Sequence, residues 1–202
     1  MKEIFKRLNE ENNSSLVVFD FDGTMTLSNS ETSIGVFTKY LPEKYRKRKI
    51  MIDRLTDKTR NSFLLKLLWK YKLFHLSKYL NIDLLNSIKY ESDFKINDVA
   101  REIFEILDDR IPVLVYSSGL KTIIERVIKS NGMFRSNLFV VANEINLFCS
   151  VGLRKTITPK KSKLKNCKYK NVVVIGDNFA DLRIAKNAIK IIVENDEFRV
   201  IE

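Results

Sequence analysis

Apolar residues along this chain follow two spacings, which predict strands in some segments and helices in others. Short uninterrupted apolar runs are typical of strands that are buried on both faces of a sheet. Apolar residues that recur three or four positions apart are typical of helices that pack one face on a core. The predicted strands lie at about residues 15–21, 112–117, 138–142, 172–175 and 189–193, with a small β excursion within 144–157.

Helical spacing predicts helices between most of these strands. It also fills the long segment from about residue 30 to residue 108, where no strand is predicted. Because single strands and helices alternate along the rest of the chain, we expect an α/β fold, with a mainly parallel sheet in a three-layer, Rossmann-like core. The other predicted helices lie at about residues 1–12, 99–107, 121–130, 160–165 and 180–188.

Two aspartate-rich motifs follow two of the predicted strands. Residues 20–26 read DFDGTMT and residues 176–181 read GDNFAD. Ligands of open α/β sheets collect beyond the carboxyl ends of the strands, so we expect the two motifs to share one cleft. Either motif alone could be a turn or a helix cap, but two at equivalent strand ends favour a site. The carboxylates that would meet there are Asp20, Asp22, Asp177 and Asp181.

Four neighbouring carboxylates repel one another unless they share a cation, and a hard divalent metal suits oxygen ligands. Mg²⁺ is the natural choice, because it keeps coordination positions open for water and a substrate phosphate.

The two motifs resemble those of the haloacid dehalogenase (HAD) superfamily, whose first motif reads DxDx(T/V) and whose last commonly reads GDxxxD. The superfamily's second motif is a Ser or Thr that closes an apolar strand, and Ser117 fits it. The third is a lysine upstream of the last motif. Lys160 is favoured because an apolar residue follows four positions later, Lys161 and Lys163 remain open, and Lys155 is the next candidate.

The resemblance implies an Mg²⁺-dependent phosphatase that hydrolyses a small phosphomonoester through an aspartyl-phosphate intermediate. Asp20 would be the nucleophile, and Asp22 would protonate the leaving oxygen and later accept a proton from water. The metal would contact Asp20, the backbone carbonyl of Asp22, and Asp177, with Asp181 bracing the metal site or the lysine. Ser117 would bind the phosphoryl oxygens with Ser118 and Gly119 beside it, and Lys160 would neutralise charge.

The helical segment at 30–108 lies where some members of the superfamily carry a helical cap domain, with residues 1–29 and 109–202 forming the catalytic core. This cap and the Ser-x-Gly form of the second motif resemble the phosphoserine phosphatase-like branch, to which pyrimidine 5′-nucleotidases are related. Candidate substrate-binding residues in the cap are Glu31, Arg54 and Arg60. A nucleotidase and a phosphotransferase remain as alternatives, and a less favoured one is a basic nucleic-acid-associated protein that uses the HAD fold only as a scaffold.

Several other chemistries lose support from residue counts. His75 is the only histidine and lies in an apolar helical stretch, which argues against a serine–histidine triad and against a two-histidine metal site. Cys149 and Cys167 lack the spacing of a zinc or redox pair. No glycine-rich Walker loop occurs.

The chain carries 36 basic and 25 acidic residues, a formal charge of +11. This charge could steer anionic substrates or bind nucleic acid, and we favour a solvated surface over a nucleic-acid groove. A chain of 202 residues without a signal-like or membrane-length apolar run, and with two cysteines, leads us to expect a cytoplasmic enzyme.

Overall fold

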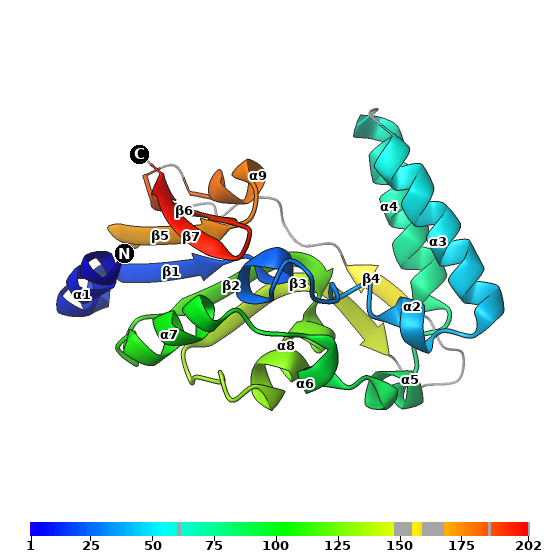
Figure 1. The fold of residues 1–202 in the computed structure, drawn as a ribbon, viewed down its shortest axis with the longest axis horizontal. Coiled ribbons are helices and arrows are strands. Elements are labelled where there is room, and N and C mark those ends of the chain that lie inside the picture. Colours follow the sequence, from blue (N-terminus) through cyan, green and yellow to red (C-terminus); the bar gives the residue numbers. More distant parts are fainter. Residues whose placement is uncertain (60–61, 148–154, 159–167, 186, 202) are drawn as a thin grey trace.

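The computed structural model describes residues 1–59, 62–147, 155–158, 168–185 and 187–201, and seven strands within them form one sheet (Figure 1). The strand order is β4-β3-β2-β1-β5-β6-β7. The five strands from β3 to β6 in this order run parallel, while β4 and β7 pair antiparallel at the two edges. The strands are β1 (Ser15–Phe19), β2 (Val113–Leu120), β3 (Leu138–Leu147), β4 (Lys155–Thr158), β5 (Asn171–Gly176), β6 (Ile189–Glu194) and β7 (Glu197–Ile201).

The central strand β1 is buried on both faces, which explains its uninterrupted apolar sequence. Val17 and Phe19 belong to a core on one face, together with apolar residues of α1, α7 and α8. Leu16 and Val18 belong to a second core on the other face, where Leu182 of α9 packs. The structure therefore confirms the predicted α/β class with a mainly parallel sheet between helical layers.

Helices occupy most of the segment between β1 and β2, as the apolar spacing predicts. α3 and α4 pack against each other, stand beside the sheet and extend beyond it (Figure 1). Two later helices begin at asparagines, Asn81 and Asn97, whose side chains accept hydrogen bonds from backbone N–H groups of the first turn. The helices are α1 (Lys2–Glu10), α2 (Phe37–Tyr40), α3 (Glu43–Lys58), α4 (Ser62–Ser77), α5 (Ile82–Ser87), α6 (Tyr90–Asp93), α7 (Asp98–Ile106), α8 (Lys121–Ser130) and α9 (Phe179–Leu182), with short non-α turns at Asn12–Ser14 and Phe21–Met25.

Two predicted elements near the carboxyl end of the chain are wrong. The helix expected at 180–188 ends at Leu182. The strand expected to be the last is followed by β7, which returns through a turn at Asn195 and Asp196. Both turn residues have positive φ angles, 51° and 67°, which is typical of a tight hairpin and which asparagine and aspartate tolerate.

The helix predicted at 160–165 lies outside the described residues. Among the helices that the structure describes, none combines the length and the apolar content that crossing a bilayer requires.

Candidate active site

The carboxyl ends of three neighbouring strands bring Asp20, Ser117 and Asp177 to one end of the sheet. Phe19 at the end of β1 pairs with Val115 of β2 and with Ile175 of β5. Asp20 follows directly, is buried, and donates its backbone N–H to the Ile175 carbonyl at 2.9 Å. In the same register, Ser117 lies two residues beyond Val115, and Asp177 lies two residues beyond Ile175.

The loop after β1 folds back against the Asp177 carboxylate. Gly23 has a φ of +81°, and a Cβ atom added there would lie 2.8 Å from Asp177 Oδ2. A side chain at this position would therefore be strained and would also collide with the carboxylate. The Gly23 N–H donates to Thr26 Oγ1 at 3.1 Å, which closes the loop.

Asp22 is held by a residue that sequence reasoning missed. The backbone N–H of Ser33 donates to Asp22 Oδ1, and the Ser33 hydroxyl donates to Asp22 Oδ2, each at 2.7 Å. Burial raises the pKa of the Asp22 carboxyl, the two Ser33 hydrogen bonds oppose this shift, and the negative charge of Asp177 adds to it. An acid that stays protonated above its ordinary range suits proton donation near neutral pH.

Gly119 completes this contact from β2. A Cβ atom at Gly119 would lie 1.9 Å from Ser33 Oγ and 3.2 Å from Asp22 Oδ2. The glycine thus allows three segments that are distant in sequence to meet at the Asp22 carboxyl. No local pattern around Ser33 indicates this, because the contact depends on how the loop after β1 crosses the end of β2.

The other two residues of the second motif face different surroundings. Ser117 is buried, and its hydroxyl accepts the Gly119 N–H at 2.9 Å. Ser118 is exposed, while its carbonyl accepts a hydrogen bond from the side chain of Asn143, a buried residue of β3. Asn143 therefore anchors the turn that presents Ser117, a supporting role that its sequence context does not indicate.

Other predicted site residues are not brought to this cluster by the described contacts. The Glu31 carboxylate forms an ion pair with Lys39 Nζ at 3.1 Å, and Arg54 lies exposed on α3. Asp181 lies in α9, but its side chain is not among the described atoms, and neither is that of Lys155 in β4. Arg60, Lys160, Lys161 and Lys163 lie outside the described residues.

The donor atoms at the strand ends fit a hard divalent cation in chemical type. Asp20 and Asp177 supply carboxylate oxygens, and the close approach of Gly23 to Asp177 brings the backbone that follows Asp20 to the same carboxylate. Among the side chains that the structure describes, no three His, Cys, Asp or Glu residues are grouped as a metal site. Asp22 turns its carboxylate to Ser33, so only its backbone carbonyl remains as the expected ligand.

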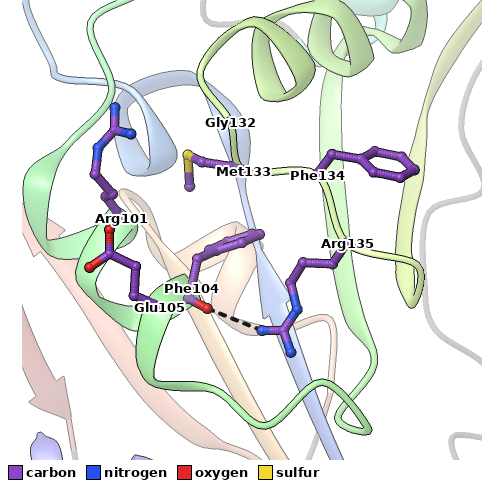
Figure 2. A pocket seen from close by; sticks show the side chains of 7 residues that line it. All are labelled: Arg101, Phe104, Glu105, Gly132, Met133, Phe134 and Arg135. Carbon is purple, nitrogen blue, oxygen red and sulfur yellow. Dashed lines mark hydrogen bonds between the residues drawn. The ribbon is translucent and has the colours of Figure 1, made fainter.

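A cavity of about 100 Å³ lies at the opposite end of the strands (Figure 2). Its residues come from α7 and from the segment that leads into the amino end of β3. Arg135 crosses it and donates from Nη1 to the Phe104 carbonyl at 3.2 Å and from Nη2 to the Leu107 carbonyl at 3.1 Å. These bonds tie the segment before β3 to α7, and the cavity takes no part in the strand-end cluster.

A parallel sheet with paired aspartates after its central strand, a serine near the carboxyl end of one neighbour and an aspartate after the other resembles the arrangement expected above for HAD phosphatases. The family model described as pyrimidine 5′-nucleotidase (UMPH-1) matches residues 10–194. The chain belongs to this family, which confirms the predicted superfamily.

Three similar proteins illustrate the relationship. A 7-methylguanosine phosphate-specific 5′-nucleotidase A from Xenopus laevis is 29% identical over 137 residues, which are 57% of this chain and 47% of that protein. The chain thus spans about half the length of this curated relative. A crystal structure of cytosolic 5′-nucleotidase IIIB bound to cytidine matches with a TM-score of 0.69 and 16% identity, over 93% of this chain and 76% of that one. A phosphoserine phosphohydrolase-like protein from Francisella tularensis subsp. tularensis SCHU S4 matches with a TM-score of 0.51 and 17% identity, over 84% of this chain and 81% of that one.

Proposed function

We propose that this protein is a Mg²⁺-dependent phosphatase that hydrolyses nucleoside 5′-monophosphates through an aspartyl-phosphate on Asp20. The observation that carries the proposal is the pair of unlike carboxyls after β1. Asp20 lies buried at the strand end, while Asp22 is held by Ser33 and desolvation of its carboxyl raises its pKa. Two carboxyls with different proton affinities can divide the roles of nucleophile and acid.

In the first half-reaction, an Asp20 oxygen forms a bond to phosphorus as the ester P–O bond breaks, and Asp22 gives its proton to the leaving oxygen. In the second, Asp22 takes a proton from water, the water oxygen bonds to phosphorus, and the bond to Asp20 breaks. Ser117 donates its hydroxyl to a phosphoryl oxygen, with backbone N–H groups of the same turn.

Bound Mg²⁺ would be held by Asp20, Asp177 and the Asp22 carbonyl, and it would neutralise charge on the phosphoryl oxygens. Asp181 is proposed to brace this site, and Lys160 to supply a second positive charge. Both follow from the superfamily pattern and stay proposals.

A nucleotide is the proposed substrate because the family and the curated relative are both named for 5′-nucleotidases. Phosphoserine is the second candidate, since one structural neighbour is phosphoserine phosphohydrolase-like. Recognition of the ammonium group of phosphoserine would require an available carboxylate, and Glu31 already forms an ion pair with Lys39. That ion pair favours the nucleotide. The cytoplasm is the proposed location, in keeping with the low cysteine count.

The test of this proposal is phosphate release from pyrimidine nucleoside monophosphates, 7-methylguanosine monophosphate, phosphoserine and a small aryl phosphate. Asp20→Asn should abolish turnover of all four while the protein stays folded, because a carboxamide cannot act as the nucleophile. Chelation should remove activity and Mg²⁺ should restore it, with Ca²⁺ a poor substitute. Activity of Asp20→Asn within about tenfold of the wild type would refute the assignment.

Two variant sets refine the proposal. If Lys160 is the motif lysine, Lys160→Ala should lose far more activity than the matched variants Lys161→Ala and Lys163→Ala. Glu31→Ala, Arg54→Ala and Arg60→Ala should change the ranking of natural substrates and spare the aryl phosphate. Adding competing alcohols would reveal phosphotransfer, and salt-sensitive nucleic-acid binding without turnover would support the scaffold alternative.

A further inference from the structure

The positive charge of this chain is concentrated in the two helices that stand beside the sheet. Residues 43–77, which we call the α3–α4 pair, contain eleven lysines and arginines and three acidic residues. This surplus of eight is most of the formal charge of +11 for all 202 residues. The charge is therefore a local property of one part of the molecule.

The same two helices expose large apolar side chains at helical spacing. Leu67, Tyr71 and Phe74 of α4 follow one another four and three positions apart, which places them on one helical face. Met51 and Leu55 of α3 lie one turn apart. These five side chains are between 46% and 57% exposed. Groups of exposed apolar residues of this kind mark interaction surfaces, unlike single exposed ones.

The exposed apolar residues differ from the residues through which α3 and α4 are packed. Ile52 of α3 and Leu73 and Leu76 of α4 are buried and supply the packing. α4 also lies against β4. The pair extends beyond the sheet (Figure 1). About half of the surface of each exposed side chain is thus available to a partner, although Tyr71 also stacks beside His75 and Lys78 lies over the Phe74 ring.

Charge selects among the possible partners. A second copy of the chain would bring a surplus of eight positive charges against another eight, which opposes close approach. Nucleic acid would satisfy the charge, but its binding surfaces are polar and leave leucine and phenylalanine faces without a role. An anionic lipid surface satisfies both features, because lysines and arginines meet the headgroups while apolar side chains enter the acyl boundary.

From this combination we infer that the α3–α4 pair binds the surface of an anionic lipid membrane. α4 lies along the interface with Leu67, Tyr71 and Phe74 inserted between headgroups. Exposed lysines such as Lys58 and Lys70 contact lipid phosphates, with their aliphatic stems over the apolar side chains. The binding does not depend on the proposed hydrolase activity.

Flotation of the purified protein with lipid vesicles tests this inference. The protein should float with phosphatidylglycerol vesicles and not with phosphatidylcholine vesicles, and raised salt should weaken the binding. The double variant Leu67→Ser, Phe74→Ser should lower the vesicle partition coefficient by about tenfold or more. Lys58→Gln with Lys70→Gln should weaken binding to phosphatidylglycerol and reduce its salt dependence.

Matched controls distinguish binding through the α3–α4 pair from non-specific binding of the protein to vesicles. Phe134→Ser removes a side chain that is 70% exposed and far from the pair in sequence. Lys6→Gln with Lys129→Gln removes two exposed lysines from α1 and α8. Both controls should bind vesicles as the wild type does.

Four results would overturn the inference. The first is no flotation with phosphatidylglycerol. The second is equal loss in Phe134→Ser and the α4 variant. The third is a dimer in solution that the α4 variant dissociates without any vesicle binding. The fourth is retention of RNA, but not of vesicles, by the wild type.

Discussion

Replacing Ser33 with alanine should shift the pH dependence of catalysis through Asp22. The wild-type hydroxyl donates to Asp22 Oδ2 at 2.7 Å, while the backbone N–H donates separately to Oδ1. Ser33→Ala removes the first bond and keeps the second. Because both bonds favour the ionised carboxylate, the loss of one should raise the pKa of Asp22 further above its usual value.

The expected size of the shift follows from the energy of a hydrogen bond to a charged group. Such a bond contributes about 1.5–3 kcal/mol. One pKa unit corresponds to about 1.4 kcal/mol, so the shift should be about 1–2 units upward. Asp22 must be protonated to donate to the leaving oxygen, and activity falls as pH rises through its pKa. The alkaline limb should therefore move to higher pH.

The assay is the pH profile of kcat/KM for a nucleoside monophosphate, which reports ionisations of the free enzyme. A matched control exists in Ser28, whose N–H and hydroxyl donate to the two oxygens of the half-buried Asp196 at 2.7 and 3.2 Å. Ser28→Ala should leave the profile unchanged. An alkaline limb that stays in place or moves to lower pH in Ser33→Ala would refute the role of Ser33.

Three further predictions concern stability and packing. Asp22→Asn should abolish turnover and raise the thermal midpoint at pH values above the raised pKa of Asp22, where the wild type must ionise a desolvated carboxyl, and each kcal/mol gained adds about 2–4 °C. Gly119→Ala should lower kcat sharply in a folded protein, because its Cβ must displace the Ser33 hydroxyl, and an unchanged kcat would contradict the close approach. Asp53→Asn should cost about 2 kcal/mol of unfolding free energy in urea titrations, because buried Lys49 loses its 2.8 Å ion pair. Burial favours a raised pKa for Asp53, yet its lysine hydrogen bonds lower it overall, so this contribution should vanish in the wild type as pH falls through the lowered value.

The elements that could be predicted from the sequence are those whose burial in the core requires apolar residues at regular positions. The run before Asp20 is apolar at every position because β1 packs against helices on both sides. The predicted bounds of α8 match residues 121–130, where the buried residues recur at helical spacing on one face. The meeting of Asp20 and Asp177 was predictable for the same reason, since each follows a buried parallel strand.

Features that rest on one turn or one tertiary contact were not predictable in this way. None of the five residues of β7 is buried, so its apolar pattern is weak, and only the Asn195–Asp196 turn indicates it. α9 ends after four residues, although apolar residues continue at helical spacing beyond it. The Asp22–Ser33 pair joins residues eleven positions apart through a loop, where no periodicity exists to read.

Ser33 also changes how catalysis and specificity divide along the chain. It lies within residues 30–108, the segment expected to form a cap that selects substrates, yet its hydrogen bonds reach the proposed proton donor. A bridge between Thr26 and Ile96 joins the chain before the α3–α4 pair to the chain after it, and the close approach of Ser33 to Gly119 places Ser33 against β2. Any motion of the segment that displaces Ser33 would remove both of its hydrogen bonds and admit water to the Asp22 carboxyl, two changes that act on the pKa of Asp22 in opposite directions. The position of the helical segment and the protonation of the acid are therefore coupled at one serine, and a boundary drawn at residue 30 separates two groups that act together.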